Sequence, residues 1–149
     1  MKLSALRARA IIPASTGHPD RISFTVPMAA LGKPRMTRRD KWARRPCVVE
    51  YRHWCDMLRA ACPHVPDAAS VYTLEVIATY TPPASWSKAK RALAMGMHKR
   101  TAPDGDNILK GVADALWEDD AAVGDQIVRR RYGERDEAEV ILWMVDRPF

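Results

Sequence analysis

The stretch PDGDNILKGVADALWEDDAAVGDQIVRRRYG, residues 103–133, joins a helical pattern to a strand pattern and so decides the fold. Its apolar residues recur at helical spacing on one side: Ile108, Leu109, Val112, Ala115 and Leu116. At 100° per residue, Asp106, Lys110 and Asp114 fall within about 80° of one another, almost opposite the apolar side. Residues 125–132 then have the pattern of a strand. The stretch predicts a helix that packs by one face and leads into a sheet.

The flanking sequence predicts the remaining strands and helices. Alternating apolar residues predict strands at 22–28, 72–80 and 138–146. Helical spacing after Pro46 predicts a helix that ends before Pro63, and SWSKAKRALAMG, residues 85–96, is typical of a short basic helix. This order predicts an α+β fold, a single compact domain at 21–149 with a mixed sheet of about four strands packed against two main helices. Residues 1–20 are expected to form a loose basic extension.

Length and cysteine content limit the class of protein. A chain of 149 residues with 47% apolar residues is the size of one domain. Cys47, Cys55 and Cys62 are odd in number and lack Cys-x-x-Cys spacing, so they indicate neither a disulfide framework nor a zinc site. Free thiols fit a reducing cytoplasm, and Cys55 and Cys62 lie on the apolar stripe of a helix. Because no stretch approaches the roughly 20 apolar residues that span a bilayer, no membrane association is expected.

Positive charge is concentrated in residues 33–45, which we call the basic segment. Seven of its 13 residues are Lys or Arg and only Asp40 is acidic, in a chain of net charge +6. Such a cluster is typical of a surface that binds a polyanion, although a solvated loop is an equally frequent explanation. The cluster alone therefore leaves both interpretations open.

Asp104 and Asp106 stand at the start of the helix and also have two explanations. An aspartate there accepts hydrogen bonds from free backbone N–H groups and faces the positive end of the helix dipole, which needs no catalysis. Lys110, four residues after Asp106, is likewise a common surface pair. A pair of carboxylates is also what a hard divalent cation prefers as ligands. Spacing alone does not separate a cap from half of a metal site.

A second acidic cluster, WEDDAAV at 117–123, follows the same helix. Negative charge at a helix C-terminal end is disfavoured by the dipole, so Glu118, Asp119 and Asp120 suggest that a cation offsets the cost. A helix of about 12 residues is roughly 18 Å long. Asp120 can therefore meet Asp104 only if the chain after the helix carries it back.

These residues together resemble the RusA-type Holliday junction resolvases, the crossover junction endodeoxyribonucleases. The shared features in residues 103–133 are an Asp-x-Asp-Asn element, a lysine four residues after the second Asp, an Ala-Leu helix end, and an Asp-Asp pair before a strand that ends in a basic-Tyr segment. GKPRMTR at 32–38 is similar to the N-terminal Lys/Pro/Arg loop of the family, and SWSKAKRALAMGMH at 85–98 resembles the basic helix of its phage-borne members. The resemblance covers roughly residues 22–145.

The resemblance implies a Mg²⁺-dependent endodeoxyribonuclease that resolves Holliday junctions by hydrolysing phosphodiester bonds on two symmetry-related strands. It places the metal-binding carboxylates on Asp104, Asp106 and Asp120, with Asp119 as second choice, and the essential lysine on Lys110. Mn²⁺ is expected to substitute for Mg²⁺, and no small-molecule cofactor is implied. The implied partners are branched DNA and a second copy of the chain, in DNA recombination and repair in the cytoplasm.

DNA contacts are expected from the basic segment and from a loop near the aspartates. The residues concerned are Lys33, Arg35, Arg38, Arg39, Lys41, Lys99 and Arg100. Where the family often has a lysine before Pro-Asp, this chain has Ala102, and Lys99 and Arg100 are close enough to replace it.

Two alternatives stay open, a non-catalytic basic DNA-binding protein and a metal-dependent flap or fork nuclease. A serine hydrolase is not indicated, because the chain has no Gly-x-Ser-x-Gly motif. Trp54 and Trp143 are expected in the core. For Trp42 and Trp86, beside basic residues, packing is favoured over stacking on an exposed base.

Overall fold

Four strands form a mixed sheet in the computed structural model, which describes residues 21–144. They are β1 (Arg21–Val26), β2 (Val71–Tyr80), β3 (Asp125–Tyr132) and β4 (Glu137–Met144). Their spatial order is β1-β4-β2-β3, with β4 antiparallel to both neighbours and β2 parallel to β3. A parallel pair needs a long crossover connection, and the chain between β2 and β3 supplies one that contains two helices.

Alternation of side chains gives the sheet one strongly buried face. Leu74, Val76 and Ala78 of β2 are fully buried, whereas Glu75 and Ile77 between them are half-buried. The central strand β4 repeats the pattern with fully buried Ala138, Val140 and Leu142. These side chains belong to the hydrophobic core, together with the apolar faces of the helices.

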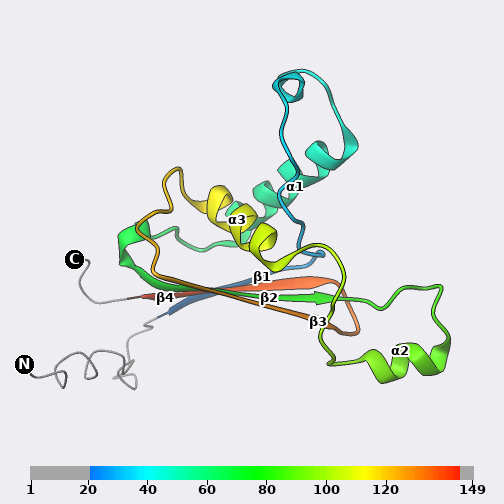
Figure 1. Ribbon diagram of the computed structural model, residues 1–149. Coiled ribbons are helices and arrows are strands. Elements are labelled where there is room, and N and C mark those ends of the chain that lie inside the picture. The colour runs from blue at the N-terminus through cyan, green and yellow to red at the C-terminus, as the bar shows by residue number, and fades with distance from the viewer. Residues whose placement is uncertain (1–20, 145–149) are drawn as a thin grey trace, which may run out of the picture.

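Two helices, α1 (Pro46–Ala61) and α3 (Gly105–Leu116), lie over the same face of the sheet (Figure 1). Pro46 occupies the first turn of α1, where the missing N–H is not needed for a helical hydrogen bond. α1 buries Val48, Tyr51, Trp54, Cys55 and Leu58, and α3 buries Ile108, Leu109, Gly111, Val112, Ala113 and Ala115. The prediction of a single α+β domain with a four-stranded mixed sheet is confirmed.

The short helix α2 (Lys88–Ala94) lies on an arm beyond the ends of β2 and β3 (Figure 1). The Ser87 hydroxyl caps it by accepting a hydrogen bond from the Lys90 N–H (3.2 Å). Trp86 packs edge-on against Tyr132, and the Lys90 ammonium lies 4.0 Å from the Trp86 ring centre. The basic helix expected in this region is present.

Three of the side chains expected in the core lie there, and two tryptophans differ. Trp54, Cys55 and Cys62 are buried as expected. Trp143 is half-buried, and its indole N–H donates to Glu75 (3.2 Å) on the side of β4 opposite Leu142. Trp42 is 73% exposed, so the preference for packing was wrong there.

Within residues 21–144, no helix is long and apolar enough to cross a membrane. The expected extension at residues 1–20 lies outside the described residues, as do residues 145–149.

Candidate active site at the start of helix α3

The start of α3 rests directly on β3, and a glycine permits the close approach. A Cβ at Gly105 would lie 2.6 Å from Cγ1 of Val128, well inside van der Waals contact. Only a residue without a side chain fits between the helix and the strand here. Gly105 therefore fixes where the two flanking aspartates, at the start of α3, lie relative to β3.

The loop before α3 is held by two cations. The Arg130 guanidinium, from β3, donates to the carbonyl oxygens of Thr101 (3.1 Å) and Pro103 (2.9 Å). The Lys99 ammonium donates to the Thr101 carbonyl and hydroxyl oxygens (3.0 and 2.8 Å) and to the carbonyl oxygen of Ala102. Burial, followed by the nearby Arg130 charge, lowers the pKa of Lys99. These contacts position the backbone that leads into Asp104.

Asp104, Asp106 and Lys110 are all exposed around the first turns of α3. Asp104 is the N-cap residue, yet its side chain makes no capping hydrogen bond. Among residues 21–144, neither aspartate side chain accepts a hydrogen bond, and Lys110 forms no ion pair with Asp106. The structural explanations for these residues, a cap and a surface pair, are therefore not realised. Both carboxylates and the ammonium face solvent, free to meet a ligand.

The second acidic cluster lies in the loop between α3 and β3. Asp119 accepts a hydrogen bond from the Ala121 N–H (3.0 Å), which is a local turn contact and accounts for its position. The Asp120 carbonyl accepts from the Val123 N–H (3.0 Å), and the Gly124 N–H donates to the Val71 carbonyl (3.1 Å). The loop is thus attached to the beginning of β2, whereas Gly105, next to Asp104, contacts Val128 of β3.

The expected convergence of three carboxylates is not seen. Within residues 21–144, no group of three or more His, Cys, Asp or Glu residues could hold a metal ion. Asp104 and Asp106 share the start of α3, and Asp120 lies in the loop that follows the helix. The chain by itself does not fit a preformed three-carboxylate metal centre.

The expected DNA-binding residues divide into internally held and exposed cations. Lys33 forms an ion pair with Asp114 of α3, and its backbone N–H donates to the Asn107 carbonyl (3.3 Å). Lys99 is held by the loop oxygens described above. The others are exposed: Arg35, Arg38, Arg39, Lys41 and Arg100. The basic segment therefore begins attached to α3 and then presents free cations to solvent.

The sequence did not predict the internal contacts of two further cations, Arg130 and Arg45, because these contacts depend on the tertiary fold. Arg130 is one of three consecutive arginines in β3, and neighbouring side chains on a strand point to opposite faces. Arg129 pairs with Glu75 (3.0 Å), whereas Arg130 reaches the loop before α3. The charge of Arg45 is paired, because its guanidinium forms an ion pair with the buried Asp40. A Thr-x-x-Asp spacing at Thr37–Asp40, similar to a capping box, was the available signal for that contact.

The family model described as Endodeoxyribonuclease RusA matches residues 26–142. A search of curated proteins finds no significant match. The matched range includes every strand except part of β1 and the end of β4, together with the whole candidate site.

Proposed function

The chain belongs to the RusA family of endodeoxyribonucleases, so it is an enzyme that hydrolyses DNA at branched junctions, and from that premise we propose its specific activity. The proposed protein is a homodimeric Mg²⁺-dependent resolvase that cuts two symmetry-related strands of a Holliday junction. Mn²⁺ is proposed to substitute for Mg²⁺. Because its three cysteines are free thiols, which fit a reducing compartment, we place the enzyme in the cytoplasm.

One observation of the site supports the catalytic assignment. Asp104, Asp106 and Lys110 are exposed on one helix start, and their charged groups have no partner among residues 21–144. Charged groups without partners at a fixed helix start contribute little to folding stability. Their arrangement is better explained by the binding of a ligand. The Lys110 ammonium is proposed to lie beside the scissile phosphate, where it would stabilise developing negative charge.

Enzymes of this family depend on a divalent metal, and we propose Asp104, Asp106 and Asp120 as its ligands. Carboxylates are the ligands that Mg²⁺ prefers, usually completed by water and substrate phosphate oxygens. Since the three side chains do not form a preformed centre in the described chain, bound DNA would have to complete the coordination. The aspartates alone would repel a phosphate backbone, which the basic segment offsets.

The test is a cleavage panel with matched synthetic DNAs: a mobile four-way junction, a fork, a flap and a linear duplex. We expect cleavage of the junction first, in two symmetry-related strands, only when Mg²⁺ or Mn²⁺ is present. Asp106→Asn should bind the junction within about twofold of wild type but cut at least about a hundredfold more slowly. Asp119→Asn, whose carboxylate makes a turn contact, is the matched control and should retain cutting.

Two outcomes would point to the alternatives. Cleavage of the fork or flap at least as fast as the junction would favour a flap or fork nuclease. Wild-type binding without any cleavage in Mg²⁺ or Mn²⁺ would favour a non-catalytic DNA-binding protein. In such a protein Asp104 would serve only as a helix cap, yet its side chain makes no capping hydrogen bond.

A further inference from the structure

A buried aspartate lies in the middle of the basic segment. Asp40 is 3% exposed, and among residues 21–144 it is the only charged side chain in the buried class. Its carboxylate accepts hydrogen bonds from the Thr37 N–H and hydroxyl (2.5 and 3.0 Å) and from Arg45 Nε and Nη2 (2.7 and 2.8 Å). Every group that faces the carboxylate is a donor. These bonds hold the pKa of Asp40 well below its usual range, with the Arg45 bond as the largest cause.

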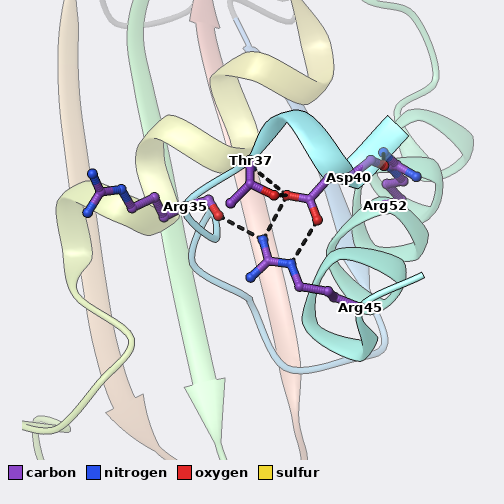
Figure 2. A network of polar contacts seen from close by, with 5 residues as sticks. All are labelled: Arg35, Thr37, Asp40, Arg45 and Arg52. Carbon is purple, nitrogen blue, oxygen red and sulfur yellow. Dashed lines mark hydrogen bonds and ion pairs between the residues drawn. The ribbon is translucent and has the colours of Figure 1, made fainter. Parts of the chain in front are cut away.

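The same contacts connect the two ends of the segment and attach it to α1 (Figure 2). Arg45 Nη2 also donates to the Arg35 carbonyl (2.9 Å), and Arg52 of α1 donates to the Asp40 carbonyl (2.8 Å). The Arg35 guanidinium itself points away from this network, as Figure 2 shows. We call these five residues, Arg35, Thr37, Asp40, Arg45 and Arg52, the Asp40 clasp. The clasp encloses the short 3₁₀ helix η2 (Arg38–Lys41).

Little else holds the segment in place. It rises from the helical layer away from the sheet (Figure 1). Its large apolar side chains, Met36 and Trp42, are 40% and 73% exposed. A hollow of about 500 Å³, lined in part by Lys33, Met36 and Asp114, lies between the segment, α1 and α3. Polar contacts therefore fix the conformation of this segment in place of core packing.

We propose that Asp40 is a positioning residue for DNA binding, which folds the basic segment into a preformed phosphate-binding surface. The clasp pairs Arg45 with Asp40. Arg38, Arg39 and Lys41 remain exposed on η2. The Lys33–Asp114 ion pair joins this surface to α3, the helix that carries Asp106. The clasp thereby sets the position of the phosphate-binding cations relative to the proposed catalytic aspartates. This inference rests on the proposed function.

The physical argument concerns the cost of ordering a loop. A flexible basic loop must lose conformational freedom when it binds DNA, and a preformed loop has already lost it on folding. A negative charge inside a DNA-binding segment would otherwise oppose binding. Here its burial and its bidentate arginine partner neutralise it locally, so the segment gains rigidity and keeps its outward positive charge.

A pair of charge-matched variants separates positioning from net charge. Asp40→Asn and Asp56→Asn each add one unit of positive charge, but Asp56 is exposed and, within residues 21–144, pairs only with Arg59 at 3.2 Å. Simple electrostatics predicts equal or tighter binding for both variants. The clasp predicts that the two variants differ. In Asp40→Asn the amide NH₂, itself a donor, would face the donor groups of Thr37 and Arg45, so the clasp would be lost and binding would weaken. We expect Asp40→Asn to bind a synthetic four-way junction about five- to tenfold more weakly, and Asp56→Asn to bind within about twofold of wild type.

Arg45→Lys provides a second test that leaves net charge unchanged. A lysine cannot reproduce the bidentate contact with Asp40 and the bond to Arg35. The variant should raise KM for junction cleavage about fivefold and leave kcat within about twofold, whereas Arg59→Lys should change neither. Trypsin should cut Arg45→Lys faster after Arg38 and Lys41 than it cuts wild type, since both sites lie inside the clasp.

The outcomes distinguish this inference from the proposed function. Asp40→Asn that binds as Asp56→Asn does, or Arg45→Lys with wild-type KM, overturns the role of the clasp even if wild type cuts junctions. A wild type that does not cut overturns the proposed function, and junction affinity then still tests the clasp. If wild type does not bind the junction either, positioning for DNA is overturned. Should Asp40→Asn fail to fold by circular dichroism, Arg45→Lys decides.

Discussion

The positively charged side chains of this protein fall into two groups. Some are held by contacts within the fold, and others are exposed to solvent. Arg45, Lys33 and Lys99 are held by Asp40, Asp114 and loop carbonyls, respectively. Arg38 and Arg39, close to Arg45 in sequence, are exposed. The basic segment, which the sequence suggests is a single positively charged surface, therefore contains both internally bonded and exposed cations. Only the exposed cations can contact phosphate without breaking an internal contact.

The Asp40 clasp predicts a specific pH dependence of stability. The pKa of Asp40 is lower in the folded protein than in the unfolded chain, where an aspartate titrates near about 3.9. Its stabilising contribution is therefore fully present above that value and is lost as pH falls through the folded pKa. The Tm difference between wild type and Asp40→Asn should be constant from about pH 5 to 8 and shrink below about pH 4. A difference that changes between pH 6 and 8 would assign the effect to another group.

The three cysteines should differ sharply in reactivity. Cys47 is exposed, whereas Cys55 and Cys62 are buried, and burial raises the pKa of both buried thiols. Because the thiolate is the reactive species, a thiol reagent at about pH 8 should modify one cysteine quickly in the native protein. All three should react in denaturant. Cys47→Ser should abolish the fast phase, and its persistence in that variant would contradict the assignment.

At the scale of elements, the position of α3 on β3 determines where the candidate site forms. Gly105 allows the helix to begin in contact with Val128, and Arg130 of the same strand holds the preceding loop. The strand thus fixes both the backbone before Asp104 and the first turn after it. The site is positioned by this helix–strand contact and not by the acidic residues themselves.

Gly105→Ala should disturb this contact. The added Cβ would meet Val128 Cγ1 at 2.6 Å, and such overpacking typically costs about 1–3 kcal/mol. We expect a lower Tm and slower junction cleavage. Val128→Ala removes the clashing methyl group, so the double variant should lose less stability than the sum of the single changes. Additive losses in thermal melts would show that the two residues do not interact.

Sequence patterns identified the elements well because each depends on local periodicity. The apolar side of α3 and the alternation in β2 were readable in windows of a few residues, and the buried residues match them. Asp106 and Lys110 were likewise expected on the solvent side of α3, where they lie. Local spacing alone fixes these properties, so tertiary structure could hardly change them.

Contacts between distant segments could not be read in the same way. Lys33 pairs with a residue 81 positions away, and nothing in GKPRMTR marks it as different from its exposed neighbours. The position of Asp120 depends on how the loop after α3 attaches to Val71, which spacing does not encode. Trp42 is exposed because the basic segment rises away from the core. Each difference arises from the path of a loop, which sequence periodicity does not determine.

At the scale of the whole molecule, the charge distribution should control binding to DNA. The chain carries a net charge of +6, and the exposed cations of η2 project from one side of the fold. Counterion release makes log Kd depend on log salt with a slope of about 0.9 per phosphate contact. Replacing Arg38 and Arg39 by Gln should reduce that slope by up to about 1.8. Arg129→Gln, which removes a cation paired with Glu75, is the control and should leave the slope unchanged.

The symmetry of a four-way junction predicts that the protein acts as a dimer. A four-way junction has approximate two-fold symmetry, and its resolution needs two cuts, so a C₂ dimer with one site per chain fits the task. Light scattering should therefore give about twice the chain mass of 16.8 kDa. In an equal mixture of wild type and Asp106→Asn chains after exchange, about half of the dimers would carry one active site. These mixed dimers should nick one strand and leave the junction unresolved. Monomer mass, with full resolution in proportion to the wild-type chains present, would contradict the dimer, because a monomer has no partner through which an inactive chain could block the second cut.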